Sequence, residues 1–495
     1  MDDLLPKLLF FPQHPPPTTP LTDTQYDEGI RAQITAVKSL SDSKLLLHTS
    51  SGESVLDFIN PAINTVPYAF TLLATINVLQ KGSKNVKGEN LWDNMTGFLA
   101  NFDPRQIRYL GSELSTIIET VVEFAHRSGQ SSAAVAPVSG ALLRYDPTGG
   151  MLTSKHLVLV KLALSSRQWA DAIPTLDNPI LYFPTPQKPP KSKLLCNMAN
   201  PPNAYITSDG GFSRKLKYHE ILEYFLYRGM IYIGTRNWKK AQQSLEDVFT
   251  FPTKEGAVSK IQIDAYKKWI LVGLLLEGKT LGLPKVTGSG PAKAFHIIAK
   301  PYEAVAQLFE TGTAARLKAE VDTGNVVWQH DCNMGLILLV LAAYQKNQIR
   351  NLASIYTKMS IQEVHTSTTS AETGARLPNV QATETLVRSM IADGSLRATL
   401  SAPPSLVLSF SLVGQALSEP QFQRELAAST TQIKALTDEV KHTDHMLTHE
   451  KDYIKWLQKQ KSNGKNVVDQ GVSGMDMDMD GNGDDEEDLM AGAYR

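Results

Sequence analysis

The chain has 495 residues, too many for one ordinary domain, and its 42% hydrophobic and 20% charged residues are typical of a globular protein. Its longest apolar run, Met334 to Tyr344, is roughly half of a membrane span, and the N-terminus lacks the basic start and cleavage site of a signal peptide, so we expect no membrane association. The only two cysteines, Cys196 and Cys332, exclude a disulfide framework and a cysteine-based zinc site, and they indicate a reducing compartment, the cytoplasm and nucleus.

The net charge of −1 conceals an acidic C-terminal end. Residues 466–495 carry nine acids against one arginine, a net charge of −8, so the other 465 residues carry +7. That positive charge is too dilute to predict a nucleic-acid interface. We predict a disordered acidic tail over residues 463–495.

The first half of the chain reads as helices between two proline-rich segments. Residues 1–25 are proline-rich and are predicted to be disordered. From Tyr26 to His126 apolar residues recur three and four positions apart, which predicts amphipathic helices, and a second helical block runs from Ser154 to Ile173. After a proline-rich segment, helical pattern resumes at Tyr218 and continues to about Tyr356. We assign residues 26–204 to N-terminal helical repeats.

A repeat can be measured within these helices. Four residues recur 69 positions later in the chain: Arg167, Trp169, Ala172 and Leu176 return as Arg236, Trp238, Ala241 and Leu245. This distance is two periods of about 34 residues, the length of a tetratricopeptide helix pair. The second copy also has Gly229 and Tyr232 where that repeat places a small and an aromatic residue. The pattern favours an α-solenoid, with a generic helical domain as the alternative.

From about Cys332 to Phe410 the pattern predicts a winged helix. Helices are expected over Met334–Lys346, Ile349–Tyr356 and Gln381–Ala392, with a further helix opened by the capping box of Ser360 and Glu363. Two extended segments, residues 395–400 and 405–410, then form a β-hairpin. The helix of residues 381–393, which would enter DNA, offers one arginine against two acids, so we expect a protein-interaction surface and no nucleic acid.

Residues 413–462 are predicted to form a long helix with a heptad pattern. The a positions are all apolar: Leu426, Ile433, Val440, Leu447 and Ile454. The d positions are half polar: Phe422, Ser429, Leu436, Thr443, Glu450 and Leu457. Such a stripe either folds back on the chain's own solenoid or joins helices of other chains, and the mixed d row favours a shared bundle over a homodimer.

Three motifs match chemical signatures in unsuitable settings. Gly273 to Thr280 reads GLLLEGKT, a literal phosphate-loop pattern, but its leucines continue a helical face, so we predict a helix that ends at Gly278. Residues 476–487 match a calcium-loop pattern without a helix before it, and we interpret them as acidic tail. His442, His445 and His449 share one helical face, which we interpret as a solvated surface. We therefore predict no cofactor, no metal and no catalytic residue.

This order of elements resembles the proteasome–signalosome–initiation-factor (PCI) family. The stretch from Met334 to Val364 is similar to the family's first winged-helix segment, and MIADGSLRATL is similar to its helix-to-wing step. Within the family, residues 224–252 and 54–73 are most similar to a signalosome subunit. The resemblance implies a PCI domain over residues 205–412, with the winged helix from about residue 332.

The resemblance also implies a function. It indicates a non-catalytic scaffold in the complex that removes a ubiquitin-like modifier from cullins, with PCI-type and metal-isopeptidase-type subunits as partners. Assembly would use paired winged helices and a bundle of C-terminal helices, which places the interface on Leu396, Ala398, Val407 and Phe410 and on the apolar heptad positions. The alternatives are a scaffold of the proteasome lid or of the translation initiation complex and, more distantly, a nucleotide-binding protein using Lys279 and Thr280.

Overall fold

The computed structural model describes residues 4–13, 20–47, 54–81, 90–184, 194–252, 257–401, 406–410, 418–448, 454–455 and 458. These residues divide into two compact units, the first of residues 1–348 and 366–378 and the second of residues 349–365 and 379–495. Stacked helices build the first unit, and the second contains a three-stranded sheet with helices. The fold is therefore a predominantly helical solenoid followed by a winged helix, as the sequence predicts.

The first unit begins with short and medium helices that precede the second proline-rich segment. Their bounds are α1 Leu5–Leu8, α2 Asp23–Lys38, α3 Asp42–Leu45, α4 Val55–Phe58, α5 Thr65–Gln80, α6 Leu91–Asn101, α7 Pro104–Ile107, α8 Gly111–Arg127, η1 Ser131–Ala134, α9 Val135–Tyr145, α10 Ser154–Ser166 and α11 Ile173–Leu176. The later elements of this unit are η2 Pro202–Ala204, α12 Tyr218–Gly234, α13 Trp238–Phe249, α14 Lys260–Glu277, α15 Ser289–Ile298, α16 Lys300–Thr311, α17 Ala314–Thr323 and α18 Asn325–His330. Helix α19, Met334–Leu352, begins in the first unit and ends in the second.

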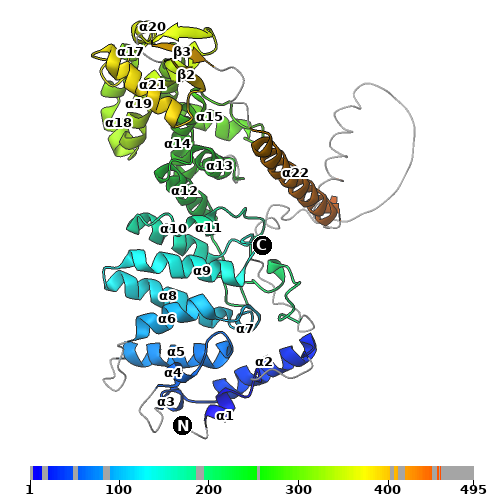
Figure 1. Ribbon diagram of the computed structural model, residues 1–495. Coiled ribbons are helices and arrows are strands. Elements are labelled where there is room, and N and C mark those ends of the chain that lie inside the picture. The colour runs from blue at the N-terminus through cyan, green and yellow to red at the C-terminus, as the bar shows by residue number, and fades with distance from the viewer. Residues whose placement is uncertain are drawn as a thin grey trace, which may run out of the picture. The chain divides into compact units, whose positions relative to one another are not determined.

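The longer helices of the first unit lie side by side in a stack, and the short helices pack against them (Figure 1). Helix α10 contacts α12, which pairs with α13, and α13 pairs with α14. A single hydrophobic core runs through the unit from Leu4 to Ala371. The core is thus continuous across residue 205, and the division between residues 26–204 and 205–412 stays a prediction.

The 69-residue repeat has a structural basis in the turns that join paired helices. Arg167 after α10 and Arg236 after α12 both adopt left-handed backbone conformations, with φ of 55° and 59°. Such a residue ends one helix and turns the chain into the next. In the first copy the second helix, α11, has only four residues, with Pro174 in its first turn. Pro179 follows shortly after its end and disfavours a longer helix.

Residues 4–13 are ordered, contrary to the disorder that their composition predicts. Leu8 is fully buried, and the Nε2 of Gln33 donates a hydrogen bond to its carbonyl. The ring of Phe11 lies edge-on to that of Tyr26 at a centroid distance of 5.3 Å and covers Gly29. Apolar side chains interspersed among the prolines give this segment a core to join, which composition alone does not reveal.

The segment of residues 366–378 packs into the first unit. Ala371 is fully buried, and the Nε2 of Gln345 donates to the Oγ1 of Thr368 at 3.2 Å. The amide of Thr369 donates to the Oε1 of Gln348 at 2.9 Å. The second compact unit begins at residue 349, within α19, and the predicted start of the winged helix near residue 332 stays a prediction.

The second unit contains a small antiparallel sheet and two helices before its long C-terminal helix. The sheet order is β1-β3-β2, with bounds β1 Lys358–Ser360, β2 Ala398–Leu400 and β3 Val407–Phe410. The helices are α20 Ile361–Ser367, α21 Val380–Ala392 and α22 Glu419–Thr448.

The predicted hairpin is present as β2 and β3, and β1 is an additional strand whose Met359 pairs with Leu408. In place of the two helices predicted over residues 334–346 and 349–356, one continuous helix, α19, runs from Met334 to Leu352, and residues 353–356 are not helical. The capping box is confirmed: the amide of Ser360 donates to Glu363 at 2.8 Å, and the amide of Glu363 donates to the Oγ of Ser360 at 3.2 Å.

Candidate interaction surfaces

The heptad positions of α22 form an exposed apolar stripe. The fraction of each side chain open to solvent is 64% for Ile433 and 66% for Val440, and the other described members are similarly exposed. Those members are Phe422, Leu426, Leu436 and, beyond the helix bounds, Ile454. Exposed aliphatic side chains in one line are costly in water, and they are typical of a helix that is covered in an assembly.

Part of the predicted stripe lies outside the described residues. The side chains of Leu447 and Leu457 lie outside the described residues, as does Glu450 of the d row. Whether the stripe serves as an interface therefore stays a prediction, and the described positions Leu426, Ile433 and Val440 carry it.

The hairpin residues predicted as an interface lie mostly in the core of their own unit. Leu396, Ala398 and Phe410 are all at most 9% exposed and pack with Ile361, among others, while Val407 is half-buried. Alternation along a strand sends every second side chain inward, and the apolar ones fill the small core beneath the sheet. A surface on the hairpin must therefore use other side chains or the edge of β2, the outer strand of the described sheet.

Two exposed apolar residues of the second unit were missed by sequence reasoning. Ile355 is 71% exposed and Tyr356 is 46% exposed, at the turn between α19 and β1. The sequence placed both at the end of a short helix, because the apolar spacing continues past Leu352 without a proline or glycine. The sequence signal that could have identified this exposed site is a pair of large hydrophobic residues directly before a strand.

The charges of α21 are paired with one another. The Nη2 of Arg388 lies 2.7 Å from the Oε1 of Glu384, one helical turn away. The one arginine of this helix is thus occupied, and phosphate binding requires several free cations.

The phosphate-loop pattern lies at the end of a helix. Residues 273–277 belong to α14, and Gly278 ends it with φ of 75° and an amide hydrogen bond to the carbonyl of Leu274. The Oγ1 of Thr280 donates to Glu310 at 2.5 Å. The amides that would wrap a phosphate are used within the helix, so the prediction that the helix ends at Gly278 is confirmed.

The other chemical motifs fall largely on residues that the structure does not describe. Residues 476–487 are among them, and of the three histidines only the side chain of His445 is described. Among the described residues no group of three or more histidine, cysteine, aspartate or glutamate side chains is placed to hold a metal ion. Within the same residues no helix has the length and apolarity needed to cross a bilayer.

Two buried ionisable groups at the start of α10 are occupied by local structure. Burial lowers the pKa of His156 to about 4, and its Nδ1 bonds with the Oγ1 of Thr153 at 2.9 Å to cap α10. Burial also lowers the pKa of Lys155, and its ammonium pairs with Glu119 on α8. The perturbed pKa values of both groups therefore follow from their structural roles, a helix cap for His156 and an ion pair for Lys155.

The chain is similar to a set of named proteins over most of its length. A model of the family described as COP9 signalosome complex subunit 3, N-terminal helical repeats, matches residues 31–289. A protein named COP9 signalosome complex subunit 3 from Neurospora crassa is 35% identical over 89% of each chain. A protein of the same name from Emericella nidulans is 31% identical over 99% of each chain. Another, from Dictyostelium discoideum, is 25% identical over 78% of this chain and 84% of its own.

Proposed function

Because the chain belongs to the family of COP9 signalosome complex subunit 3, we propose that it is a non-catalytic scaffold subunit of the signalosome. In this role it helps to hold together the complex that removes a ubiquitin-like modifier from cullins and so regulates cullin-RING ubiquitin ligases. The catalytic metal belongs to another subunit, of the metal-isopeptidase type. The cytoplasm and nucleus are the compartments in which the protein acts.

One observation carries the proposed mode of assembly: the apolar stripe on α22 is exposed. Each aliphatic side chain buried at an interface contributes roughly 1.5–3 kcal/mol, so covering five or six of them supplies a large part of the free energy of a stable assembly. The half-polar d row supports packing among several helices of other subunits rather than a symmetric pair. The winged helix is the second proposed surface, through residues other than those in its core.

Because the chain belongs to this family, we no longer favour the alternative hypotheses that it is a subunit of the proteasome lid or of the translation initiation complex. The nucleotide-binding reading is also set aside, because its pattern lies in a helix.

Affinity purification of the tagged full-length chain, followed by mass spectrometry, tests the proposal. We expect PCI-type and metal-isopeptidase-type signalosome subunits in near-equal amounts with the tagged chain. Recovery of proteasome-lid or initiation-complex subunits without signalosome subunits would overturn it.

A further inference from the structure

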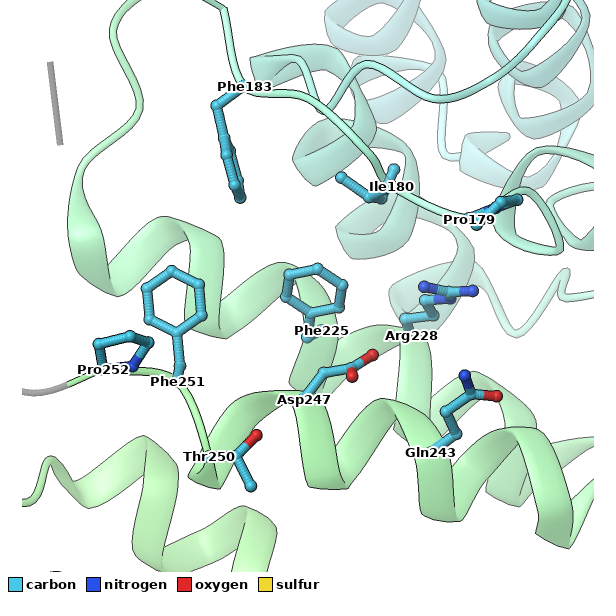
Figure 2. Close-up of a pocket in the computed structure, with 10 residues that line it drawn as sticks. All are labelled: Pro179, Ile180, Phe183, Phe225, Arg228, Gln243, Asp247, Thr250, Phe251 and Pro252. Atoms are coloured by element: carbon cyan, nitrogen blue, oxygen red, sulfur yellow. The ribbon is translucent and has the colours of Figure 1, made fainter. Parts of the chain in front are cut away.

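The solenoid has a pocket that is lined by residues of the first unit alone. It has a volume of about 380 Å³ and lies where the segment after α11 passes over α12 and α13. Phe183 extends from that segment toward Phe225 and Phe251 on the opposite wall (Figure 2). This volume is at the lower end of the range for ligand sites and is sufficient for one large side chain with its main chain.

The apolar walls are partly open to solvent. Phe225 is buried, whereas Phe183 at the rim is 43% exposed. An exposed aromatic ring beside a buried one offers area that a bound side chain would cover, and such rings are enriched among residues that dominate binding energy.

Two polar side chains, Arg228 of α12 and Asp247 of α13, point into the same space (Figure 2). The Nε of Arg228 is buried and has no hydrogen-bond acceptor among the described residues. Burial raises the pKa of Asp247 to about 6, because the stabilising charge of Arg228 does not offset the loss of water and Glu246 opposes ionisation. The guanidinium of Arg228 and the carboxylate of Asp247 thus place hydrogen-bond donors and an acceptor on the pocket wall.

The combination of charges selects the ligand. A cationic side chain would be repelled by Arg228, and an anionic one by Asp247. A neutral group that offers one acceptor and one donor satisfies both, and the peptide main chain offers these two groups on adjacent atoms. The rings then favour an uncharged apolar side chain on the same residue.

We propose that this pocket binds an extended peptide segment of a partner protein through one uncharged apolar side chain, with Arg228 donating to its main-chain carbonyl and Asp247 accepting from its main-chain amide. The pocket belongs to the solenoid and shares no residue with α22 or the winged helix. The inference therefore does not depend on the proposed function, and either one can fail alone.

Binding of capped pentapeptides to the full-length chain tests the inference by ligand-observed NMR. The peptides have alanine at the outer positions and leucine, phenylalanine, lysine or glutamate at the centre. The leucine and phenylalanine peptides are expected to bind about tenfold more tightly than the charged ones, corresponding to about 1.4 kcal/mol. Phe183→Ala should weaken their binding about fivefold, whereas Lys239→Ala, an exposed position of α13 outside the pocket, should leave it unchanged.

Charge-altering variants make the test more specific, because the peptide preference of a non-specific hydrophobic surface would not shift in opposite directions in the two variants. Asp247→Asn leaves Arg228 unopposed and should shift the preference toward the glutamate peptide. Arg228→Gln should shift it toward the lysine peptide. Since Phe183 is exposed, Phe183→Ala keeps the test valid even if a variant of the two polar residues is unstable in thermal melts.

Equal binding of all four peptides, no binding of the apolar ones, or apolar binding that survives Phe183→Ala would each overturn the inference.

Discussion

Gly229 of α12 lies directly against Leu245 of α13: a Cβ built on the glycine would stand 3.1 Å from both the Cγ and the Cδ2 of the leucine. The two helices approach this closely because the glycine has no side chain. We expect Gly229→Val to separate them and to lower the free energy of unfolding by about 1–3 kcal/mol, measured by urea denaturation.

Gly97→Val is the matched control for that variant. Gly97 also lies within a helix, α6, but a Cβ at this position would have no neighbouring atom within 4 Å. We expect this substitution to be neutral or slightly stabilising, because valine has a higher helix propensity than glycine. Equal losses at both positions would show that the α12–α13 approach has no special need for glycine.

Gly278 is expected to be intolerant of a side chain for a different reason. Its φ is 75°, and a Cβ would lie 2.1 Å from the Oδ1 of Asn347, whose Nδ2 donates to the carbonyl of Gly278 at 3.3 Å. Gly278→Ala should lower the free energy of unfolding by about 2–4 kcal/mol. Gly129→Ala, at a similar φ of 71° but in open space, separates backbone strain from the clash and should cost only about 1–2 kcal/mol.

The assembly surface is tested by Val440→Asp. The side chain is 66% exposed in the isolated chain, so we expect the thermal stability of that chain to be unchanged. In the complex, an unpaired charge in the seam should cost on the order of several kcal/mol and abolish co-purification of other subunits. Thr431→Asp, on the outer face of α22, should retain all of them. Full assembly of the Val440→Asp variant would contradict the role of the stripe.

Asp247 should make stability depend on pH in a predictable direction. Its folded-state pKa of about 6 lies above the ordinary value of 3.8, with burial as the main cause and with Arg228 and Glu246 as its charged neighbours. The folded state therefore holds the proton more tightly, and the contribution of this group to stability falls as the pH rises from about 4 to about 6. Above that range the loss reaches up to about 3 kcal/mol.

Asp247→Asn removes this dependence. Urea denaturation should find the variant more stable than the unaltered protein at pH 7.5, with the difference disappearing near pH 4. Asp209→Asn, at an exposed carboxylate, should change the free energy of unfolding by less than about 0.5 kcal/mol at both pH values. A constant difference across the pH range would mean that Asp247 titrates normally.

Nucleotide binding by the GLLLEGKT segment is expected to be undetectable. Calorimetric titration of the full-length chain with ATP and magnesium should give no binding heat, since the amides of residues 273–277 belong to α14. Lys279→Ala should leave stability unchanged, because the lysine side chain is 64% exposed. Micromolar binding that is lost in this variant would refute the helical interpretation.

The sequence by itself determined the features that depend on near neighbours in the chain. Apolar spacing of three and four marked the helices, Ser360 and Glu363 marked a helix start, and Gly278 marked a helix end, as the structure confirms. Each depends on contacts within about one helical turn, so the residues that decide it are close in sequence. The heptad stripe of α22 belongs to the same class, although its partners do not.

Only the tertiary structure decided which apolar residues stay exposed and which distant segments meet. Leu396, Ala398 and Phe410 looked like a surface but are buried under the sheet that β1 completes, and β1 pairs with a strand about fifty residues later. Likewise, residues 366–378 join the first unit, and the Phe183–Asp247 pocket arises because an irregular segment passes over two helices. Whether an apolar residue is buried depends on which distant segment of the chain packs against it, and local periodicity contains no information about that segment.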